Sequence, residues 1–345
     1  MRALRIFVTG AAGLIGGEIA ARLAARGHLV SALVHRNPDV RDNDGNIPSL
    51  HAVLAGDVSL PQFGLKTFDA VAQNQDLLIH CAATTRFNLS PEEYRATNVA
   101  GTEHAIELAR AGNMALLHVS TAYVSGWRDG IIGEDDLLPA TDFSNGYEAS
   151  KAEGEALVEK SGLVHAIARP SVVVGDSATG AIRTFDTIYA AFKLIAHGRV
   201  RHMAAIANAT IDFVPIDHVA GGLVALAEGM AAASGGRYHL VSAQPVPVAV
   251  FAAAIGAYPQ FKAPILVPPD RFDLDALPLL ERRLYARVAG LYSSYFQRDP
   301  RFDDTRFRAV TGLSCPPTGF EYLKRLIDHC IAVGFLWPSD QASRS

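Results

Sequence analysis

The stretch RIFVTGAAGLIGGEIAARLAARGHLV, residues 5–30, decides the fold. A β-rich apolar run ends at Thr9, glycines follow at positions 10, 13 and 16, and a helical pattern leads into a second β-rich run. Gly10 and Gly13 allow a tight turn and a close approach of the backbone to a pyrophosphate, while Gly16 lets the helix pack on the strand. The helix N-terminus offers free N–H groups and a favourable dipole to the anion. This unit predicts a dinucleotide site, and a glycine-rich turn without a ligand is the alternative.

The first half of the chain continues this alternation of β-rich runs and helical patterns. Helices are predicted near 14–26, 91–112 and 146–162. The buried strands are predicted in RIFVTG, HLVSALV, HAVLAG, DLLIHCAA, ALLHVST and VHAIARP. Such alternation is typical of parallel strands joined by crossover helices. The expected fold is therefore α/β, a Rossmann-type doubly wound parallel sheet over residues 1–176.

The pattern loosens after about residue 176. Residues 177–345 are expected to form mainly a smaller C-terminal substrate-binding domain, with 209–242 returning to the first domain. The segment 276–296 has an amphipathic helical rhythm with exposed arginines.

Composition narrows the class of protein. Apolar residues make up 49% of the 345 residues and charged residues 19%, so a large core is expected. The net charge of −4 gives no reason to expect nucleic acid as a partner. Apolar runs are too short for a membrane span, and Gly10 comes too early for a signal peptide. Three distant cysteines and scattered histidines fit neither a disulfide framework nor a metal site. A reduced, cytoplasmic protein without a bound metal is expected.

The end of the second β-rich run discriminates between dinucleotides. An Asp or Glu there would accept hydrogen bonds from the ribose of NAD, but the run closes with His35 and Arg36. A guanidinium suits a 2′-phosphate, so NADP is favoured over NAD. A solvent-facing loop arginine is the alternative. Asp57, at a third strand end, is expected either to accept from the adenine amino group or to cap the following turn.

The segment SNGYEASK places Tyr147 and Lys151 on one face of a predicted helix. A free tyrosine has a pKa of roughly 10, and a neighbouring ammonium lowers it. The pair is therefore expected to be a tuned proton donor or, alternatively, an ordinary helix surface.

The sequence resembles the extended short-chain dehydrogenase/reductase family over about residues 4–220. The matching motifs, in the order of the family, are TGAAGLIG, GDV, HCAA, TNVAGT, VSTAYVSG, YEASK, RPSVVVG and VPIDHVA. Within that family the motifs are most similar to the fatty acyl-CoA reductase and thioester reductase branch, the male-sterility type. The resemblance implies that Tyr147 is the proton donor and that Lys151 lowers its pKa and holds the nicotinamide ribose. It also implies that Thr121 bonds the substrate carbonyl and that Asn98 supports Lys151 through a water.

The resemblance further implies a set of contacts with NADP(H). Besides the residues already named, the set comprises Leu14 and Ile15 in TGAAGLIG, Val58 in GDV, Cys81, Ala82 and Ala83 in HCAA, and Pro170 and Ser171 in RPSVVVG, the last two beside the nicotinamide. Family members often dimerise through helices equivalent to 91–112 and 146–162, so a homodimer through them is a further expectation.

The substrate side of the site is less constrained. Arg86 and Phe87 follow HCAATT and are expected to face the substrate, although a solvated arginine and a packed phenylalanine are equally compatible with the sequence. The family often has Tyr before the Gly in VSTAYVSG; here Ser125 stands there and Tyr123 lies two residues earlier. Tyr123 is therefore a candidate for the pocket wall. A small, hydrophobic or acyl-bearing substrate is expected.

Three functions compete at this point. The leading hypothesis is an NADPH-dependent carbonyl reductase, with an acyl thioester, bound to coenzyme A or to a separate carrier, as candidate substrate and an aldehyde or alcohol as product. A nucleotide-sugar epimerase or dehydratase, or a hydroxysteroid or dihydroflavonol-type dehydrogenase, would use the same scaffold, but the missing acid after the second strand argues against an epimerase. A non-catalytic NADP-binding regulator would not need the set of Thr121, Tyr147 and Lys151.

Overall fold

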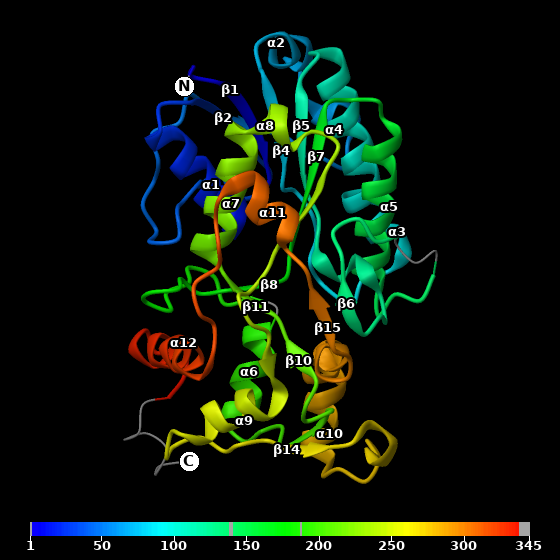
Figure 1. Ribbon diagram of the computed structural model, residues 1–345, viewed down its shortest axis with the longest axis vertical. Coiled ribbons are helices and arrows are strands. Elements are labelled where there is room, and N and C mark those ends of the chain that lie inside the picture. The colour runs from blue at the N-terminus through cyan, green and yellow to red at the C-terminus, as the bar shows by residue number, and fades with distance from the viewer. Residues whose placement is uncertain (1, 138–140, 187, 338–345) are drawn as a thin grey trace.

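The computed structural model describes residues 2–137, 141–186 and 188–337. These residues form a central sheet of seven parallel strands in the order β12-β7-β5-β4-β1-β2-β3 (Figure 1). The strands are β1 (Arg5–Thr9), β2 (Leu29–Val34), β3 (Ala52–Ala55), β4 (Leu77–His80), β5 (Ala115–Val119), β7 (His165–Pro170) and β12 (Arg237–Leu240). Strands covered on both faces read as continuous apolar runs rather than alternating ones, as Ile6, Phe7 and Val8 of β1 illustrate.

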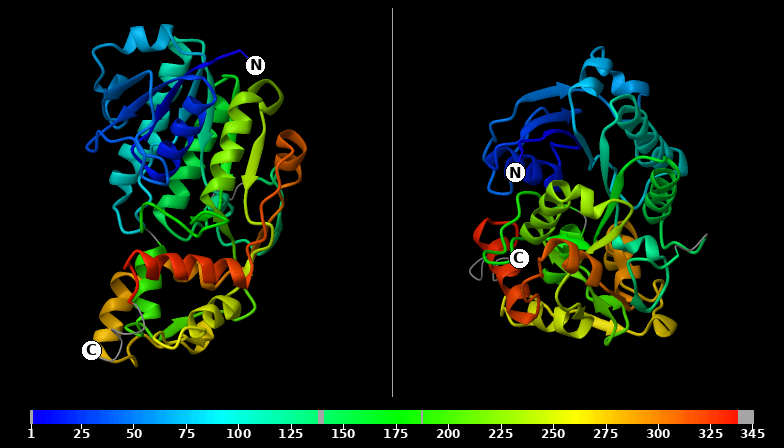
Figure 2. Two further views of the ribbon diagram at one scale, coloured as in Figure 1. Left: turned by 90° about the vertical axis from the view of Figure 1, so that its left-hand side faces the viewer. Right: turned by 45° about the horizontal axis from the view of Figure 1, so that its top comes forward.

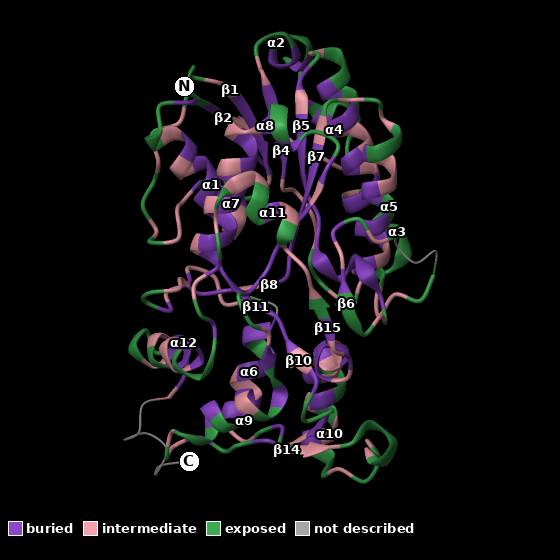
Figure 3. Cartoon of the chain, in the orientation of Figure 1, coloured by how far each residue is buried: buried purple, intermediate pink, exposed green. Residues whose placement is uncertain are grey.

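Helices cover both faces of this sheet. On one face α1 (Leu14–Ala25) packs against α7 (Ile216–Glu228), and on the other α4 (Ala100–Ala111) packs against α5 (Gly146–Lys160). Two hydrophobic clusters fill the spaces between the sheet and these helix pairs, and Figure 3 shows the buried residues concentrated there. The predicted Rossmann-type doubly wound fold is confirmed.

The strand order fixes where a ligand can bind. The chain passes from β1 to β2 on one side and from β4 to β5 on the other, so the direction of winding reverses between β1 and β4. Crevices in open α/β sheets lie outside the carboxyl ends of the strands at such a point. In Figure 1 these ends point toward the smaller C-terminal region.

The predicted helix near 91–112 contains a local irregularity. It begins as α3 (Pro91–Tyr94) behind Ser90, which forms a capping box with Glu93, and it continues through a π-helical segment, η2 (Arg95–Val99), into α4. Single π-helical turns inside longer helices are frequent at functional sites. Here the π turn contains Asn98.

The C-terminal region forms its own hydrophobic cluster below the sheet (Figures 1 and 2). Its main helices are α6 (Ile188–Ala196), α9 (Val248–Gly256), α10 (Leu279–Arg287), the 3-10 segment η5 (Ala289–Phe296) and α12 (Phe320–Ala332). Short strands pair two by two in this region and at its border: β6 (Gly130–Ile132) with β15 (Pro300–Phe302), β8 (Val172–Val174) with β11 (Phe213–Pro215), β9 (His202–Ala204) with β14 (Ile265–Val267), and β10 (Thr210–Ile211) with β13 (Val246–Pro247).

Smaller elements complete the described chain. They are η1 (Pro61–Gly64), α2 (Phe68–Gln73), η3 (Ala122–Ser125), α8 (Met230–Ala233), η4 (Pro269–Arg271) and α11 (Thr305–Thr311). The last of these returns to the sheet and packs on α7 and β12. Of the predicted substrate-binding range 177–345, residues 187 and 338–345 lie outside the described residues.

The helical rhythm over 276–296 gives two separate pieces, α10 and η5. Val288, with φ −133° and ψ −68°, separates α10 from η5. The tighter 3-10 segment buries Tyr292 and Tyr295, and both line the large cleft described below. A continuous amphipathic helix with period 3.6 is therefore replaced by two pieces because the aromatic residues of the second piece pack toward the cleft.

Candidate active site

The glycine turn forms one end of the site. Gly10 has φ +68°, in the left-handed region that only glycine adopts at little cost. A Cβ on Gly10 would lie 2.7 Å from the backbone nitrogen of Ala82, so the turn packs directly against the loop after β4. Gly13 is the N-cap of α1, and no acidic residue lies in the first turn of that helix. The free N–H groups of α1 therefore face a cradle shaped for an anion.

A cleft of about 330 Å³ extends from this turn along the carboxyl edge of the sheet. Its walls include fourteen of the residues that the sequence predicted for the site, namely Gly10, Gly13, Leu14, Ile15, Gly16, Cys81, Ala83, Phe87, Thr121, Tyr123, Tyr147, Lys151, Pro170 and Ser171. The predicted residues that do not line it are His35, Arg36, Asp57, Val58, Ala82, Arg86 and Asn98. Residues more than 150 positions apart in the chain thus meet in a single cleft.

Thr121 and Tyr147 meet at the centre of this cleft. Thr121 follows β5 and caps η3, and its hydroxyl accepts from the backbone N–H of Tyr123 at 3.3 Å. Tyr147 lies in the first turn of α5, which begins behind the N-cap Asn145. The Thr121 and Tyr147 side chains line the same cleft. Lys151 follows one turn later on the same helix face and lines the same cleft.

The pKa of Tyr147 is raised rather than lowered, in contrast to the expectation from its neighbour Lys151. Burial raises this pKa above its ordinary value and the charge of Glu148 raises it further, while the nearby Thr121 side chain acts in the opposite direction. Burial also lowers the pKa of Lys151 to about 8, against which Glu155 and the Cys81 thiol act. Burial disfavours the charged form of each group and is the largest cause of both shifts. Tyr147 therefore keeps its proton.

Asn98 holds the loop after β4 against helix α5. Its amide accepts from Thr84 N at 2.8 Å and donates to Thr84 O at 3.2 Å and to Ser150 Oγ at 2.8 Å. The side chain is buried and its hydrogen-bonding groups are used in these contacts. Its support of Lys151 through a water stays a prediction.

The residues predicted for the adenosine end lie together at the outer edge of the sheet. His35 Nε2 lies 3.2 Å from Asp57 Oδ2, and Asp57 accepts from Ser59 N at 2.9 Å and from Ser59 Oγ at 2.7 Å. Burial tends to raise the pKa of Asp57, but these hydrogen bonds and the charges of His35 and Arg36 outweigh it and lower the pKa. Asp57 therefore caps the turn, and Arg36 remains exposed. The Val58 carbonyl bonds His104 Nδ1 at 2.8 Å.

Aromatic side chains form the opposite wall of the cleft. The ring of Phe87 stacks on that of Tyr147 with 5.6 Å between centroids and lies 5.2 Å from that of Tyr292. Tyr123 meets Tyr295 edge-on at 4.6 Å. Arg86, by contrast, is exposed, and what it contributes here is its backbone carbonyl, which accepts from the Tyr94 hydroxyl at 2.6 Å. Arg86 does not line the cleft and its exposure agrees with the alternative of a solvated arginine; a contact with the substrate stays a prediction.

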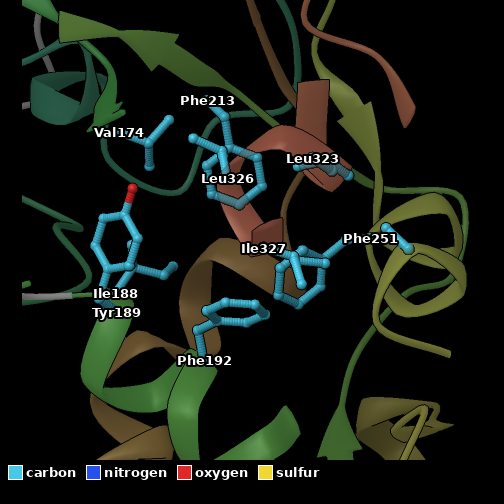
Figure 4. A pocket seen from close by; sticks show the side chains of 10 residues that line it. Val174, Ile188, Tyr189, Phe192, Phe213, Phe251, Leu323, Leu326 and Ile327 are labelled. Atoms are coloured by element: carbon cyan, nitrogen blue, oxygen red, sulfur yellow. The ribbon is translucent and has the colours of Figure 1, made fainter. Parts of the chain in front are cut away.

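An apolar cavity adjoins this cleft in the C-terminal region (Figure 4). Ile188 and Tyr189 of α6 line both spaces, so one layer of side chains separates them. The remaining walls of the cavity are side chains from β8, α6, β11, α9 and α12, namely Val174, Phe192, Phe213, Phe251, Ala254, Leu323, Leu326 and Ile327. The hydroxyl of Tyr189 accepts from Gly175 N at 3.1 Å. Apart from the Tyr189 hydroxyl, the side chains that line the cavity are hydrocarbon.

Residues 8–223 match the family described as male sterility protein. The chain belongs to this family. It is thereby an extended short-chain dehydrogenase/reductase of the thioester reductase branch, and the predicted resemblance is confirmed. The described residues of this reductase contain no cluster of His, Cys, Asp and Glu suited to a metal ion. Nor do those residues include a helix with the length and apolar character needed to cross a bilayer.

Similar proteins agree on reduction as the type of chemistry. The terminal R domain of the myxalamid PKS-NRPS biosynthetic pathway superimposes with a TM-score of 0.83 at 26% identity, covering 98% of this chain and 93% of that one. The L-2-aminoadipate reductase of Saccharomyces cerevisiae is 28% identical over 264 residues, which are 64% of this chain and 18% of that protein. An aldehyde reductase of Aspergillus flavus is 26% identical over 273 residues, 69% and 25% of the two chains. The reductase described here thus spans a quarter or less of these two relatives.

Epimerases share the fold of this reductase. A UDP-galactose 4-epimerase superimposes with a TM-score of 0.69 at 18% identity, covering 97% of this chain and all of that one. At this level of identity only the architecture is common to the two. The oxidoreductase class and the NAD(P)-binding domain therefore follow from the family and from the closer relatives.

The sequence did not reveal several groups around the site. From the C-terminal region Thr184, Asp186, Ile188, Tyr189, Tyr292 and Tyr295 line the cleft. The aromatic run LYSSYF at 291–296 could have suggested the last two. Two buried ion pairs also involve α5: Arg298 with Glu148, the neighbour of Tyr147, and Arg169 with Glu155, one turn after Lys151. Nothing local in the sequence indicates that these distant charges meet.

Proposed function

We propose that this protein is an NADPH-dependent reductase of acyl thioesters. The observation that carries the proposal is the convergence of Thr121, Tyr147 and Lys151 in one cleft that begins at the glycine turn. The branch of the family and the R-domain relative support a thioester as substrate. A catalytic set of this kind has no use in a non-catalytic regulator.

The residues present fit a dinucleotide. The cradle at Gly10 has no room for a Cβ, and the α1 N-terminus carries no competing carboxylate. In the proposed complex the turn and the helix N-terminus hold the pyrophosphate, Arg36 binds the 2′-phosphate, and Lys151 binds the nicotinamide ribose. Pro170 and Ser171 flank the nicotinamide. When bound, NADPH supplies a hydride. His35 and Arg36 in place of an acid favour NADPH over NADH and argue against an epimerase.

The hydroxyls of Thr121 and Tyr147 are the groups of this chain that act on the carbonyl. Both donate hydrogen bonds to its oxygen, which stabilises the negative charge that develops there during reduction. Tyr147 then gives its proton to that oxygen. The raised pKa of Tyr147 suits this direction, because the proton must still be present when the carbonyl binds. The ammonium of Lys151 stabilises the phenolate that remains.

For a thioester the first reduction gives a hemithioacetal. Its collapse breaks the carbon–sulfur bond and releases an aldehyde and a free thiol, and a second reduction of the aldehyde would give an alcohol. The aromatic wall of the cleft offers hydrocarbon surroundings to an acyl chain. A hydrophobic acyl group is therefore the proposed substrate class.

The test measures NADPH consumption and thiol release together, with acyl-CoAs, aldehydes, a ketosteroid and UDP-glucose as substrates. Equal amounts of NADPH oxidised and coenzyme A released in the first turnover are expected with acyl-CoA. Tyr147→Phe should lower kcat about 10²- to 10⁴-fold. Tyr258→Phe, the same change at a tyrosine whose hydroxyl bonds Asp328 at 2.6 Å, is the matched control. Conversion of UDP-glucose without net NADPH loss would overturn the proposal.

A further inference from the structure

A buried histidine lies directly beneath Lys151. His118 belongs to β5, where it is the register partner of His80 in β4, and none of its surface is exposed. Its Nε2 lies 3.5 Å from Lys151 Nζ, a long hydrogen bond. A Cβ on Gly154 of α5 would lie 3.6 Å from the same nitrogen, so His118 packs beneath the helix segment that carries Lys151. No step proposed above uses this imidazole.

The surroundings keep the His118 ring neutral. Burial, followed by the charge of Lys151, lowers the pKa of His118 well below its usual range, with smaller effects from His80 and His165. A neutral imidazole has one nitrogen that donates and one that accepts. Because an ammonium can only donate, Nε2 is the acceptor and the proton is on Nδ1. Among the described residues Nδ1 has no hydrogen-bond partner.

A second neutral imidazole supports the first. The ring of His80 stacks on that of His118 with 5.5 Å between centroids and 21° between planes. His80 Nδ1 is 2.8 Å from Thr9 Oγ1, which fixes the ring at the end of β1. Burial, with a smaller effect of Lys151, lowers the pKa of His80 to about 3. Neither ring therefore adds a positive charge next to the ammonium.

The other groups facing Lys151 supply little hydrogen bonding. Glu155 favours the ammonium through its charge, but its carboxylate is already bound by Arg169 of β7 through bonds of 2.9, 3.2 and 2.6 Å. The Cys81 thiol has its pKa raised by burial to about 12 and so stays protonated. Within the described part of the chain, His118 Nε2 is the side-chain atom that hydrogen-bonds Lys151 Nζ.

We propose that His118 is a positioning residue that holds the ammonium of Lys151 from below, keeping it charged and aimed at the cleft. An ammonium has three N–H groups; His118 takes one and leaves two for ligands in the cleft. The inference rests on the proposed function for the role of Lys151 in binding the dinucleotide and stabilising the phenolate. In this inference His118, on strand β5, supports Lys151 in that role.

The test compares His118→Leu, which removes the acceptor, with His118→Gln, whose side-chain amide reaches the position of Nε2. His118→Asn, whose amide reaches only the level of Nδ1, is the further variant if the leucine protein does not fold. Three properties are measured: the pKa of Lys151 by NMR of ¹³Cε-labelled lysine, with its signal assigned by its loss in Lys151→Arg; the Kd of NADPH by fluorescence; and the alkaline limb of kcat/KM.

Removing an acceptor destabilises the ammonium, so the Lys151 pKa should fall by about one unit in His118→Leu and His118→Asn. The alkaline limb should shift down equally, and the Kd of NADPH should rise about tenfold. His118→Gln should keep all three properties close to those of the wild type. An unchanged Lys151 pKa in the leucine and asparagine variants, or a glutamine variant that behaves like them, would overturn the inference. Because the NMR titration and the Kd need no substrate, they test His118 even if the wild type reduces no thioester.

Discussion

Arg298 and Glu148 form an ion pair whose loss should be among the most destabilising changes in this protein. The two side chains are 1% and 0% exposed. Arg298 Nη2 donates to Glu148 Oε1 at 2.5 Å, and Nη1 donates to Glu148 Oε2 at 3.2 Å and to Gly126 O at 2.7 Å. The guanidinium also lies 4.7 Å from the ring centre of Tyr123. The pair ties the start of α5, where Tyr147 lies, to the C-terminal region.

The size of the effect follows from which charge is left behind. Arg298→Met leaves the Glu148 carboxylate buried, and among the described residues the Ser144 N–H at 3.2 Å is then its remaining donor, so a loss of roughly 3–5 kcal/mol is expected. Glu148→Gln leaves the guanidinium buried, but its contacts with the Gly126 carbonyl and with aromatic faces offset roughly 1–2 kcal/mol of the cost of losing its partner. The double variant Arg298→Met/Glu148→Leu replaces the pair by hydrocarbon and should recover most of the loss.

Urea unfolding followed by tryptophan fluorescence measures these differences. The matched control is Arg301→Met, which breaks the ion pair of Arg301 with Asp299 at 2.7 Å; the Arg301 side chain is 59% exposed, and the expected loss is below about 1 kcal/mol. The reasoning would be refuted if Arg298→Met cost no more than Arg301→Met. A double variant no more stable than Arg298→Met alone would refute it equally.

Three further outcomes are expected. Arg36→Ala should raise the Kd of NADPH about 10- to 100-fold and leave the Kd of NADH nearly unchanged, since a charged hydrogen bond contributes roughly 1.5–3 kcal/mol. Equal effects on both Kd values would show that Arg36 does not bind the 2′-phosphate. Gly10→Ala should weaken binding of both dinucleotides and lower the free energy of unfolding by roughly 1–3 kcal/mol, because φ is +68° and the new Cβ meets Ala82. Titration calorimetry measures the binding and calorimetric melting the stability; no change in either would contradict this prediction. The kcat/KM for reduction should fall as pH rises through about 8, where Lys151 loses its proton, and a profile flat to pH 10 would contradict that assignment.

The sequence by itself determined the fold and the first half of the site. The glycine turn, the alternation of strands and helices and the family motifs are local patterns, and each needs only neighbouring residues to be recognised. Because parallel strands end at one edge of the sheet, such motifs predict a common cleft without any coordinates. Fourteen of the predicted residues line that cleft, from Gly10 to Ser171. The side chain of Arg86, with no such constraint, turns to solvent.

Only the tertiary structure decided the electrostatics and the substrate wall. The pKa of Tyr147 rises rather than falls because burial, which no spacing of residues reveals, is the largest influence on it. Arg298 meets Glu148 across 150 residues of chain, and His118 meets Lys151 across 33, because strands and helices distant in sequence pack together. The break at Val288 likewise follows from packing of the aromatic residues after it, not from helical periodicity. Local patterns place the backbone, but solvation and long-range contacts set the chemistry of the groups it carries.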